Sequence, residues 1–307
     1  MKTVCLVLFS ILTFLALHSH AQLPQTITPH FSSWLQKNGY GSFKFDRSDI
    51  SGGSYGGKTD DKDKVTKEPI IFFHGNSDHA VGSQGDDFNG FTDTITYLLT
   101  QGYKESEMYI TTWGPADKNL ASQQYHSYAY ISYLRNFTEA VLKYTGAKKI
   151  DVIAHSMGVT LARKVIRGGS MTDLGTSYEL GDSFAPKVDT FLGIAGANLG
   201  LVACYLAFTL PTCGKQNGFY PGIAPGPIQL STFLDDLLKN EQKEGDYVFT
   251  MLSTADDLIM YGDKVWGKYT SQIAYENDCK IYTDLGHMAM KRQTYTEQLQ
   301  IITKHAI

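Results

Sequence analysis

Residues 149–167 read KIDVIAHSMGVTLARKVIR, and this stretch changes character at its middle. The apolar run 150–154 is typical of a buried strand, and it breaks at the HSMG of residues 155–158. Over residues 157–167 apolar side chains recur every four positions, as on one face of a helix. The stretch therefore predicts a strand, a sharp turn and a helix, with Ser156 at the turn.

Similar segments alternate on both sides of this stretch. We expect strands at 70–73, 108–113, 150–154, 188–194, 247–252 and 280–284, and helices at 31–37, 88–99, 123–144, 157–167 and from about residue 288 onward. Short strands that are apolar throughout and are separated by helices indicate a parallel sheet that is covered on both faces. The predicted fold class is α/β with a mostly parallel central sheet. Ligands of such folds bind at the carboxyl ends of the strands.

The composition is that of an ordinary globular protein. The chain has 307 residues, of which 42% are hydrophobic and 19% charged, and its formal net charge is -4. This acidic balance lends no electrostatic support to a nucleic-acid partner, so we expect none.

The first 21 residues differ from the rest of the chain. Lys2 supplies a positive start, residues 4–17 form an apolar stretch of 14 residues, and residues 19–21 read SHA, a small-x-small cleavage site. This pattern indicates a secretory signal peptide at residues 1–21, because a membrane anchor needs about 20 apolar residues. The longest later candidate, residues 201–210, is too short to span a bilayer. We therefore expect a secreted protein without a transmembrane segment.

Removal of the signal peptide leaves Cys204, Cys213 and Cys279. In an oxidising compartment an odd number means that at least one thiol is unpaired or pairs between chains. Cys204 and Cys213 enclose a short loop, so we expect a disulfide between them, although the sequence leaves both pairings with Cys279 open. The sequon at 136–138, NFT, makes Asn136 a candidate for N-glycosylation.

Ser156 lies where a catalytic serine is found in α/β enzymes. A strand-turn-helix junction lifts the hydroxyl to the end of the sheet, and small residues must flank it so that strand and helix can approach. Ala154 and Gly158 meet this demand. The alternative is that Ser156 only caps the helix, since serine is favoured at helix starts. The neighbouring His155 is expected to point away from the serine.

A nucleophilic serine also needs a base and a carboxylate that orients it. His287 follows the last predicted strand and precedes the final helix, which suits a base, although it could instead be a polar residue that caps the helix. Asp256 directly follows the strand 247–252; Asp257 is an alternative to it, and either could cap the next helix. The order Ser156, aspartate, His287 is the one expected for this architecture.

The stretch PIIFFHGN at 69–76 ends another predicted strand. Its glycine lets the backbone turn beneath a substrate, so the backbone N–H groups of Asn76 and Met157 are the expected donors to an oxyanion. His74 is expected to stabilise the loop and not to act as a base.

Five stretches between about residues 69 and 290 resemble the class 2 lipases, best known as small secreted bacterial lipases with a compact α/β-hydrolase fold. They read IIFFHGN, TGAKKIDVIAHSMG, FLGIAGAN, STADDLIM and LGHMAM. Alanine in place of the first glycine, as in AHSMG, is characteristic of that family. The resemblance places the catalytic acid at Asp256 and the oxyanion donor at Asn76, where bacterial members often have a branched aliphatic residue. The larger outline is similar to secreted lipase-like proteins of nematodes.

The chain departs from the compact family pattern in two places, an N-terminal extension (22–68) and a longer segment at about 197–246. The expected domain plan is therefore a signal peptide (1–21), the extension (22–68) and an α/β-hydrolase domain (69–307) that carries an insert at about 197–246. The resemblance implies the hydrolase domain. It also implies a secreted serine hydrolase that cleaves lipid esters through an acyl-enzyme, with the lipid ester met at a lipid–water interface and with no cofactor and no metal. The alternative is a catalytically idle lipase-like protein that binds or stores lipid.

One apolar segment of the insert bears on the substrate. Residues 200–211 read GLVACYLAFTLP. Apolar runs are usually buried, so we expect a core segment. If the segment were exposed, it would face an acyl chain or a lipid surface, for instance as a lid.

Overall fold

The computed structural model describes residues 22–239 and 241–307, so the predicted signal peptide lies outside the described residues. A seven-stranded sheet forms its centre, in the order β1-β3-β2-β4-β7-β8-β11. Its strands are β1 (Ser54–Tyr55), β2 (Ile70–Phe73), β3 (Met108–Thr111), β4 (Ile150–His155), β7 (Val188–Ile194), β8 (Tyr247–Ser253) and β11 (Asp278–Tyr282). Only β1 runs antiparallel to its neighbour. The predicted α/β class with a mostly parallel sheet is confirmed.

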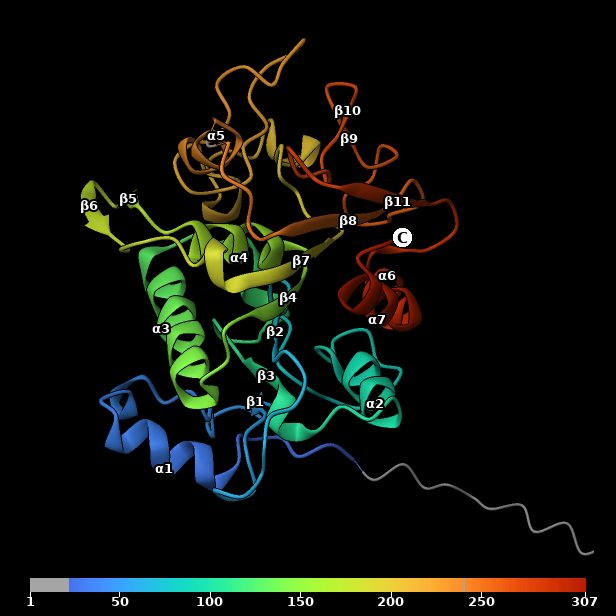
Figure 1. The fold of residues 1–307 in the computed structure, drawn as a ribbon. Helices are drawn as coiled ribbons and strands as arrows, with labels where there is room; N and C mark the ends of the chain where they lie inside the picture. The colour runs from blue at the N-terminus through green and yellow to red at the C-terminus, as the bar shows by residue number, and fades with distance from the viewer. Residues whose placement is uncertain (1–21, 240) are drawn as a thin grey trace, which may run out of the picture.

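Helices cover both faces of the sheet (Figure 1). They are α1 (Pro29–Lys37), α2 (Thr92–Thr100), α3 (Tyr128–Thr145), α4 (Met157–Arg167), α5 (Thr232–Lys239), α6 (His287–Gln293) and α7 (Tyr295–Lys304). Alternate residues of β2 enter two separate cores: Ile71 and Phe73 pack with α1, α3, α4 and α5, whereas Ile70 and Phe72 pack with α2, α6 and α7. Burial on both faces is the reason that β2 is apolar at every position.

Several predicted elements begin or end at different residues. The helix expected from residue 88 begins at Thr92, after Gly90 adopts a positive φ of 58°. The helix expected from residue 123 begins at Tyr128, because Ser127 caps it by accepting a hydrogen bond from the Tyr130 N–H at 3.2 Å. Residues Lys118–Gln123 instead form a separate 3₁₀ helix, η3. Such ends depend on local caps and turns.

Residues 22–68, the predicted N-terminal extension, pack onto the sheet. β1 adds an edge strand beside β3. In α1 the Phe31 ring stacks on Tyr144 with centroids 4.4 Å apart and meets Tyr109 of β3 edge-on at 5.5 Å. These aromatic contacts make the segment part of the larger core.

The apolar segment 200–211 is buried only in its first half, where Leu201 and Val202 pack against the larger core and Cys204 is buried. The expectation of a core segment is wrong for residues 205–211, which are mostly exposed. Leu206 is 83% exposed, and three further side chains are 38–42% exposed: Tyr205, Phe208 and Leu210. The segment is anchored by other groups, because Cys204 and Cys213 are bonded to each other and buried, and Phe219 enters the core. A loop held in this way does not need to bury its own apolar side chains.

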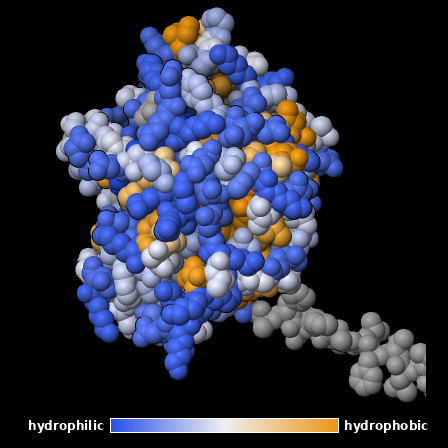
Figure 2. All heavy atoms as spheres, viewed as in Figure 1, coloured by the Kyte–Doolittle hydropathy of each residue, from blue (hydrophilic) through white to orange (hydrophobic). Residues whose placement is uncertain are grey.

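Hydrophobic atoms reach the surface in separate groups on the face drawn in Figure 2. One group lies at the top of the molecule, over the region where Figure 1 draws the segments around α5. Within residues 22–239 and 241–307, none of the helices has the length and apolar character needed to cross a membrane.

Candidate active site

Ser156 lies at a strained turn between β4 and α4. Its backbone has φ 55° and ψ -131°, a conformation that is costly for a residue with a side chain and that concentrates at functional sites. The Ser156 N–H donates to the Ile194 carbonyl at 2.9 Å. Its hydroxyl makes no capping hydrogen bond to α4. Strain without a cap argues against the helix-cap interpretation.

Two glycines allow the chain to approach this turn. A Cβ on Gly158 would lie 2.3 Å from the Phe73 carbonyl oxygen and 2.4 Å from that of His74. A Cβ on Gly75 would lie 3.0 Å from the Cβ of Ser156. The small residues around Ser156 are therefore required by the close packing of α4 on the end of β2.

His287 and Asp256 form a buried pair after neighbouring strands β11 and β8. The His287 Nδ1 lies 2.7 Å from Asp256 Oδ2, while Asp256 Oδ1 accepts the N–H groups of Leu258 at 2.9 Å and Ile259 at 2.7 Å. The carboxylate can only accept, so the proton lies on Nδ1. The remaining nitrogen, Nε2, is buried and has no hydrogen-bond partner in the described part of the chain.

Asp257, the alternative to Asp256, contacts a different atom of the same histidine. Its Oδ1 accepts the backbone N–H of His287 at 2.8 Å and so caps α6. A Cβ on Gly286 would lie 2.9 Å from that oxygen, so the cap needs the glycine. Of the two aspartates only Asp256 reaches the imidazole.

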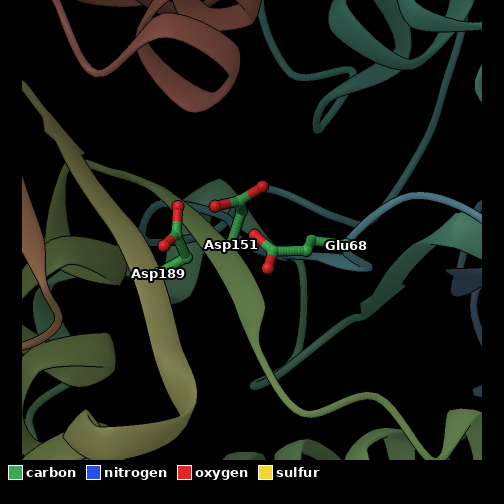
Figure 3. A group of neighbouring side chains, drawn as sticks. All are labelled: Glu68, Asp151 and Asp189. Atoms are coloured by element: carbon green, nitrogen blue, oxygen red, sulfur yellow. The ribbon is translucent and has the colours of Figure 1, made fainter.

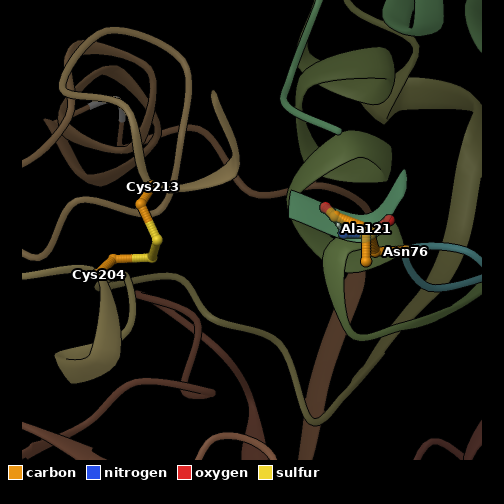
Figure 4. The surroundings of a disulfide bond; sticks show 4 residues. All are labelled: Asn76, Ala121, Cys204 and Cys213. Carbon is orange, nitrogen blue, oxygen red and sulfur yellow. Dashed lines mark hydrogen bonds between the residues drawn. A yellow bond between two sulfur atoms is a disulfide. The ribbon is translucent and has the colours of Figure 1, made fainter. Parts of the chain in front are cut away.

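The loop after β2 presents the expected oxyanion donors. The Asn76 side-chain Nδ2 donates to the Ala121 carbonyl of η3 at 2.9 Å (Figure 4). The Asn76 Oδ1 accepts the Ser77 hydroxyl at 3.0 Å, and the two bonds fix the loop. Among residues 22–239 and 241–307 the backbone N–H groups of Asn76 and Met157 have no recorded acceptor. Both groups are therefore available to a ligand.

His74 stabilises this loop, as the sequence predicts. Its Nδ1–H donates to the Gly75 carbonyl at 2.8 Å, its Nε2 accepts the Trp113 N–H at 3.1 Å, and its ring stacks on the Trp113 indole. Burial lowers the pKa of His74 to about 4. The ring is neutral at physiological pH and has both nitrogens occupied.

His155, expected to point away from Ser156, packs against His287. Its Nε2–H donates to the His287 carbonyl at 3.0 Å, the two rings lie 4.7 Å apart, and His155 lines the same cavity as Ser156. Burial, followed by the neighbouring charges of His287 and Lys291, lowers the pKa of His155 well below its usual range. His155 is therefore a neutral residue that supports His287, and no short sequence motif indicates this contact.

The candidate residues meet at one cavity of about 320 Å³. Ser156, His287, Asn76 and Met157 line it, and the rest of the lining is mainly apolar: Phe88, Ala195, Ala197, Leu201, Phe219, Leu258, Ile259 and Met288. A small polar end in a mainly apolar hollow suits a ligand with a polar group on a hydrocarbon chain.

The insert forms one wall of this cavity. Cys204 and Cys213 form the disulfide that their spacing predicts, and Cys279 is a half-buried free thiol. The 3₁₀ helix η6 (Pro211–Cys213) contacts η3, and Thr212 lines the cavity, so the disulfide lies on a segment beside the Asn76–Ala121 contact (Figure 4). The bridge holds that wall in place.

Two other groups of residues lie outside the cavity. Asn136 is half-buried in α3, with its Nδ2 donating to the Ser132 carbonyl at 2.8 Å, and its glycosylation stays a prediction. Glu68, Asp151 and Asp189 point toward one another where β2, β4 and β7 begin, with carboxylate oxygens within 4.8 Å (Figure 3). This acidic cluster is at the opposite end of the sheet from Ser156.

Residues 67–300 match the family model Lipase (class 2). The chain belongs to the class 2 lipase family. The family and the hydrolase fold support a lipase or esterase function, that of a carboxylic ester hydrolase.

Solved structures show the same fold at low sequence identity. The mature form of Bacillus licheniformis lipase BlEst2 is 12% identical, with a TM-score of 0.50 over 81% of this chain and 96% of that chain. Its propeptide form has a TM-score of 0.52 at 12% identity, over 82% of this chain and 53% of that one. Aspergillus fumigatus lipase B has a TM-score of 0.48 at 12% identity, and the match covers 75% of this chain and 48% of that one, so this chain spans about half the length of that lipase. The class 2 lipase described here has an α/β-hydrolase fold.

Proposed function

We propose that this class 2 lipase cleaves lipid esters with Ser156 as nucleophile, His287 as general base and Asp256 as the acid that orients His287. One observation carries the proposal. The buried His287–Asp256 bond fixes the imidazole so that Nε2 is free, and it does so at the cavity that Ser156 also lines.

The reaction proceeds in two halves. The Ser156 Oγ attacks the ester carbonyl while the His287 Nε2 takes its proton, and the Asp256 carboxylate stabilises the resulting imidazolium. The imidazolium then gives the proton to the ester oxygen as its bond to the carbonyl carbon breaks, so that the alcohol departs and the acyl group stays on Ser156. Water then attacks the acyl-enzyme with His287 again as base, and a carboxylic acid and free Ser156 result.

The oxyanion that forms in each half is stabilised by the backbone N–H groups of Asn76 and Met157. Met157 is the first residue of α4, where the partial positive charge of the helix N-terminus adds to the N–H donors. Asn76 is fixed through its side chain, so its backbone donor is held before the substrate arrives.

Replacement of the serine tests this assignment. We expect Ser156→Ala to lower the rate of hydrolysis of a soluble short-chain ester by ~10³-fold or more. Ser122→Ala is the matched control, because Ser122 also lines the cavity but is exposed and outside the mechanism. Equal turnover by Ser156→Ala and the unchanged protein would overturn the site assignment. If the unchanged protein were folded but hydrolysed no ester, the alternative of an idle lipid-binding protein would be favoured.

A lipid substrate at an interface is supported by the exposed apolar rim, which we define as Tyr205, Leu206, Phe208 and Leu210 of the insert together with Leu258, Met260 and Tyr261. Leu258 is both exposed and part of the cavity lining. On the side of the insert, Thr212 lines the same cavity and lies two residues after the rim residue Leu210. Exposed apolar surface beside a mainly apolar cavity favours a lipid surface as the source of substrate.

The rim is tested by comparing two equally exposed leucines. Leu206 is 83% exposed on the rim, and Leu174 is 82% exposed on the hairpin between β5 (Ser170–Asp173) and β6 (Thr176–Glu179). We expect Leu206→Ser to reduce hydrolysis of emulsified triacylglycerol several-fold and to leave soluble-ester hydrolysis unchanged. Leu174→Ser should change neither rate. Equal effects of the two substitutions would remove the rim from the function.

Secretion belongs to the same proposal. The Cys204–Cys213 disulfide is typical of an oxidising compartment, and the composition of residues 1–21 is that of a signal peptide. N-terminal sequencing of the exported protein should begin at Gln22.

A further inference from the structure

A buried ion pair joins the two segments that flank Ser156. The Lys291 ammonium bonds to Asp78 Oδ2, and 213 positions separate the two residues in the chain. Both side chains are at most 1% exposed. Separation of the two residues would leave a buried charge without a counter-charge, which is strongly destabilising, so the pair holds the two segments in one arrangement.

Asp78 belongs to the turn that presents Asn76. Its N–H donates to the Gly75 carbonyl at 3.3 Å, and its Oδ1 accepts the N–H groups of His79 at 2.9 Å and Gly90 at 3.0 Å. The carboxylate therefore ties the turn to the chain before α2. Any movement of Asp78 would move the oxyanion donor two residues earlier.

Lys291 lies one turn after His287 on α6, on the same face of the helix. Its ammonium also donates to the Gly90 carbonyl at 2.9 Å. The first residue of α6 is held by Asp257 at its N–H and by His155 at its carbonyl. Lys291 therefore connects this helix to the loop after β2 at a buried point, while its neighbour Arg292 contacts the exposed part of the same loop at Gly85 and Asp87.

We propose that Asp78 and Lys291 are positioning residues that set the distance between the Asn76 oxyanion donor and the His287 imidazole. This inference rests on the proposed ester hydrolysis. The expected effect on the rate is large, because a misplacement of about 1 Å in a catalytic group costs up to ~100-fold in rate. Neither residue needs to touch the reacting atoms.

The pair also leaves an electrostatic signature. Asp256, Asp257 and His155 contact His287, and Lys291 lies four residues after it on α6. Asp78 and Lys118 line the same cavity as His287, and His74 and His79 lie near Asp78. Asp78→Asn leaves the Lys291 cation uncompensated, which disfavours the His287 imidazolium. Lys291→Met leaves the Asp78 anion uncompensated, which favours it. The acidic limb of kcat/KM should therefore move to lower pH in the first variant and to higher pH in the second.

The experiment compares Asp78→Asn, Lys291→Met and the double variant, with kcat, KM, the pH profile on a soluble ester and Tm measured for each. We expect the double variant to fold, to regain the acidic limb of the unchanged protein and to lose ~10-fold or more in kcat with little change in KM. The matched control is the double substitution Lys164→Met with Asp236→Asn, which removes an ion pair between α4 and α5 that does not line the cavity. It should leave kcat unchanged.

A double variant with kcat within about twofold of the unchanged protein would overturn the inference. So would single variants whose activity falls only with the folded fraction while the pH limbs stay in place. Failure of the proposed function would give a different result. The unchanged protein would then be inactive, or the Ser156→Ala variant would be as active as the unchanged protein.

Discussion

The two ends of the central sheet both bury carboxylates, but they stabilise them differently. At the carboxyl ends of the strands, Asp256 accepts two backbone N–H groups and the His287 imidazole, and Asp78 accepts two backbone N–H groups and the Lys291 ammonium. At the amino ends, Asp151 is buried beside Glu68 and Asp189 and accepts the Thr190 N–H at 3.2 Å.

The pKa values follow this difference. Burial, the largest single influence, would raise the pKa of Asp78, but the Lys291 ammonium together with His74 and the Gly90 N–H holds that pKa below its usual range. Burial, followed by the charges of Glu68 and Asp189, raises the pKa of Asp151 well above its usual range. Helices begin after parallel strands, so free N–H groups gather at the carboxyl ends and stabilise anions there. Only that end of the sheet is suited to charged catalytic groups.

The largest effect is expected at Asp256. Asp256→Asn keeps the shape of the side chain but no longer stabilises the correct tautomer and charge of His287, so kcat should fall by ~10³- to 10⁴-fold. Asp257→Asn is the matched control. It weakens only the cap of α6, and its loss should be at most ~10-fold. Steady-state kinetics on a soluble ester would measure both, and equal losses would contradict the assignment of Asp256.

The next effect is on stability at the same end of the sheet. Asp78→Asn leaves Lys291 buried without a counter-charge and should lower the free energy of unfolding by about 3–5 kcal/mol at neutral pH. Because the pKa of Asp78 is depressed in the folded protein, its contribution is present above the ordinary carboxyl pKa and is lost as the pH falls. Urea unfolding from pH 7 to pH 3 would measure it. A constant difference across that range would show that the charge is not the cause.

The smallest effect, of opposite sign, is expected at the amino end. Folded Asp151 binds a proton more tightly than the unfolded chain does, so its contribution is present below the ordinary carboxyl pKa and is lost as the pH rises through the raised value. Asp151→Asn removes this loss and should raise Tm by a few degrees at pH 8 but little at pH 4. Asp246→Asn, which breaks an exposed pair with Lys149, is the control and should change Tm little. A lower Tm for Asp151→Asn at pH 8 would reverse the comparison.

Much of the candidate active site could be predicted from local sequence. The strand-turn-helix pattern around Ser156 predicts its place at the end of the sheet, and the order of Asp256 and His287 predicts a shared edge. Position along the chain could not separate Asp256 from Asp257, because adjacent residues follow the same strand. Their side chains point in different directions, so one reaches the imidazole and the other the backbone of α6.

The sequence by itself determined the fold class and the sharp turn at Ser156 that needs Gly158, because each depends on residues close together in the chain. The short loop between Cys204 and Cys213 favoured their pairing, and the tertiary structure decided it. Only the tertiary structure decided that residues 205–211 are mostly exposed and that Asp78 meets Lys291. Both outcomes depend on which distant segments pack together, and the apolar pattern of one segment does not specify its partner. A catalytic motif is local, but the contacts that position its members are not.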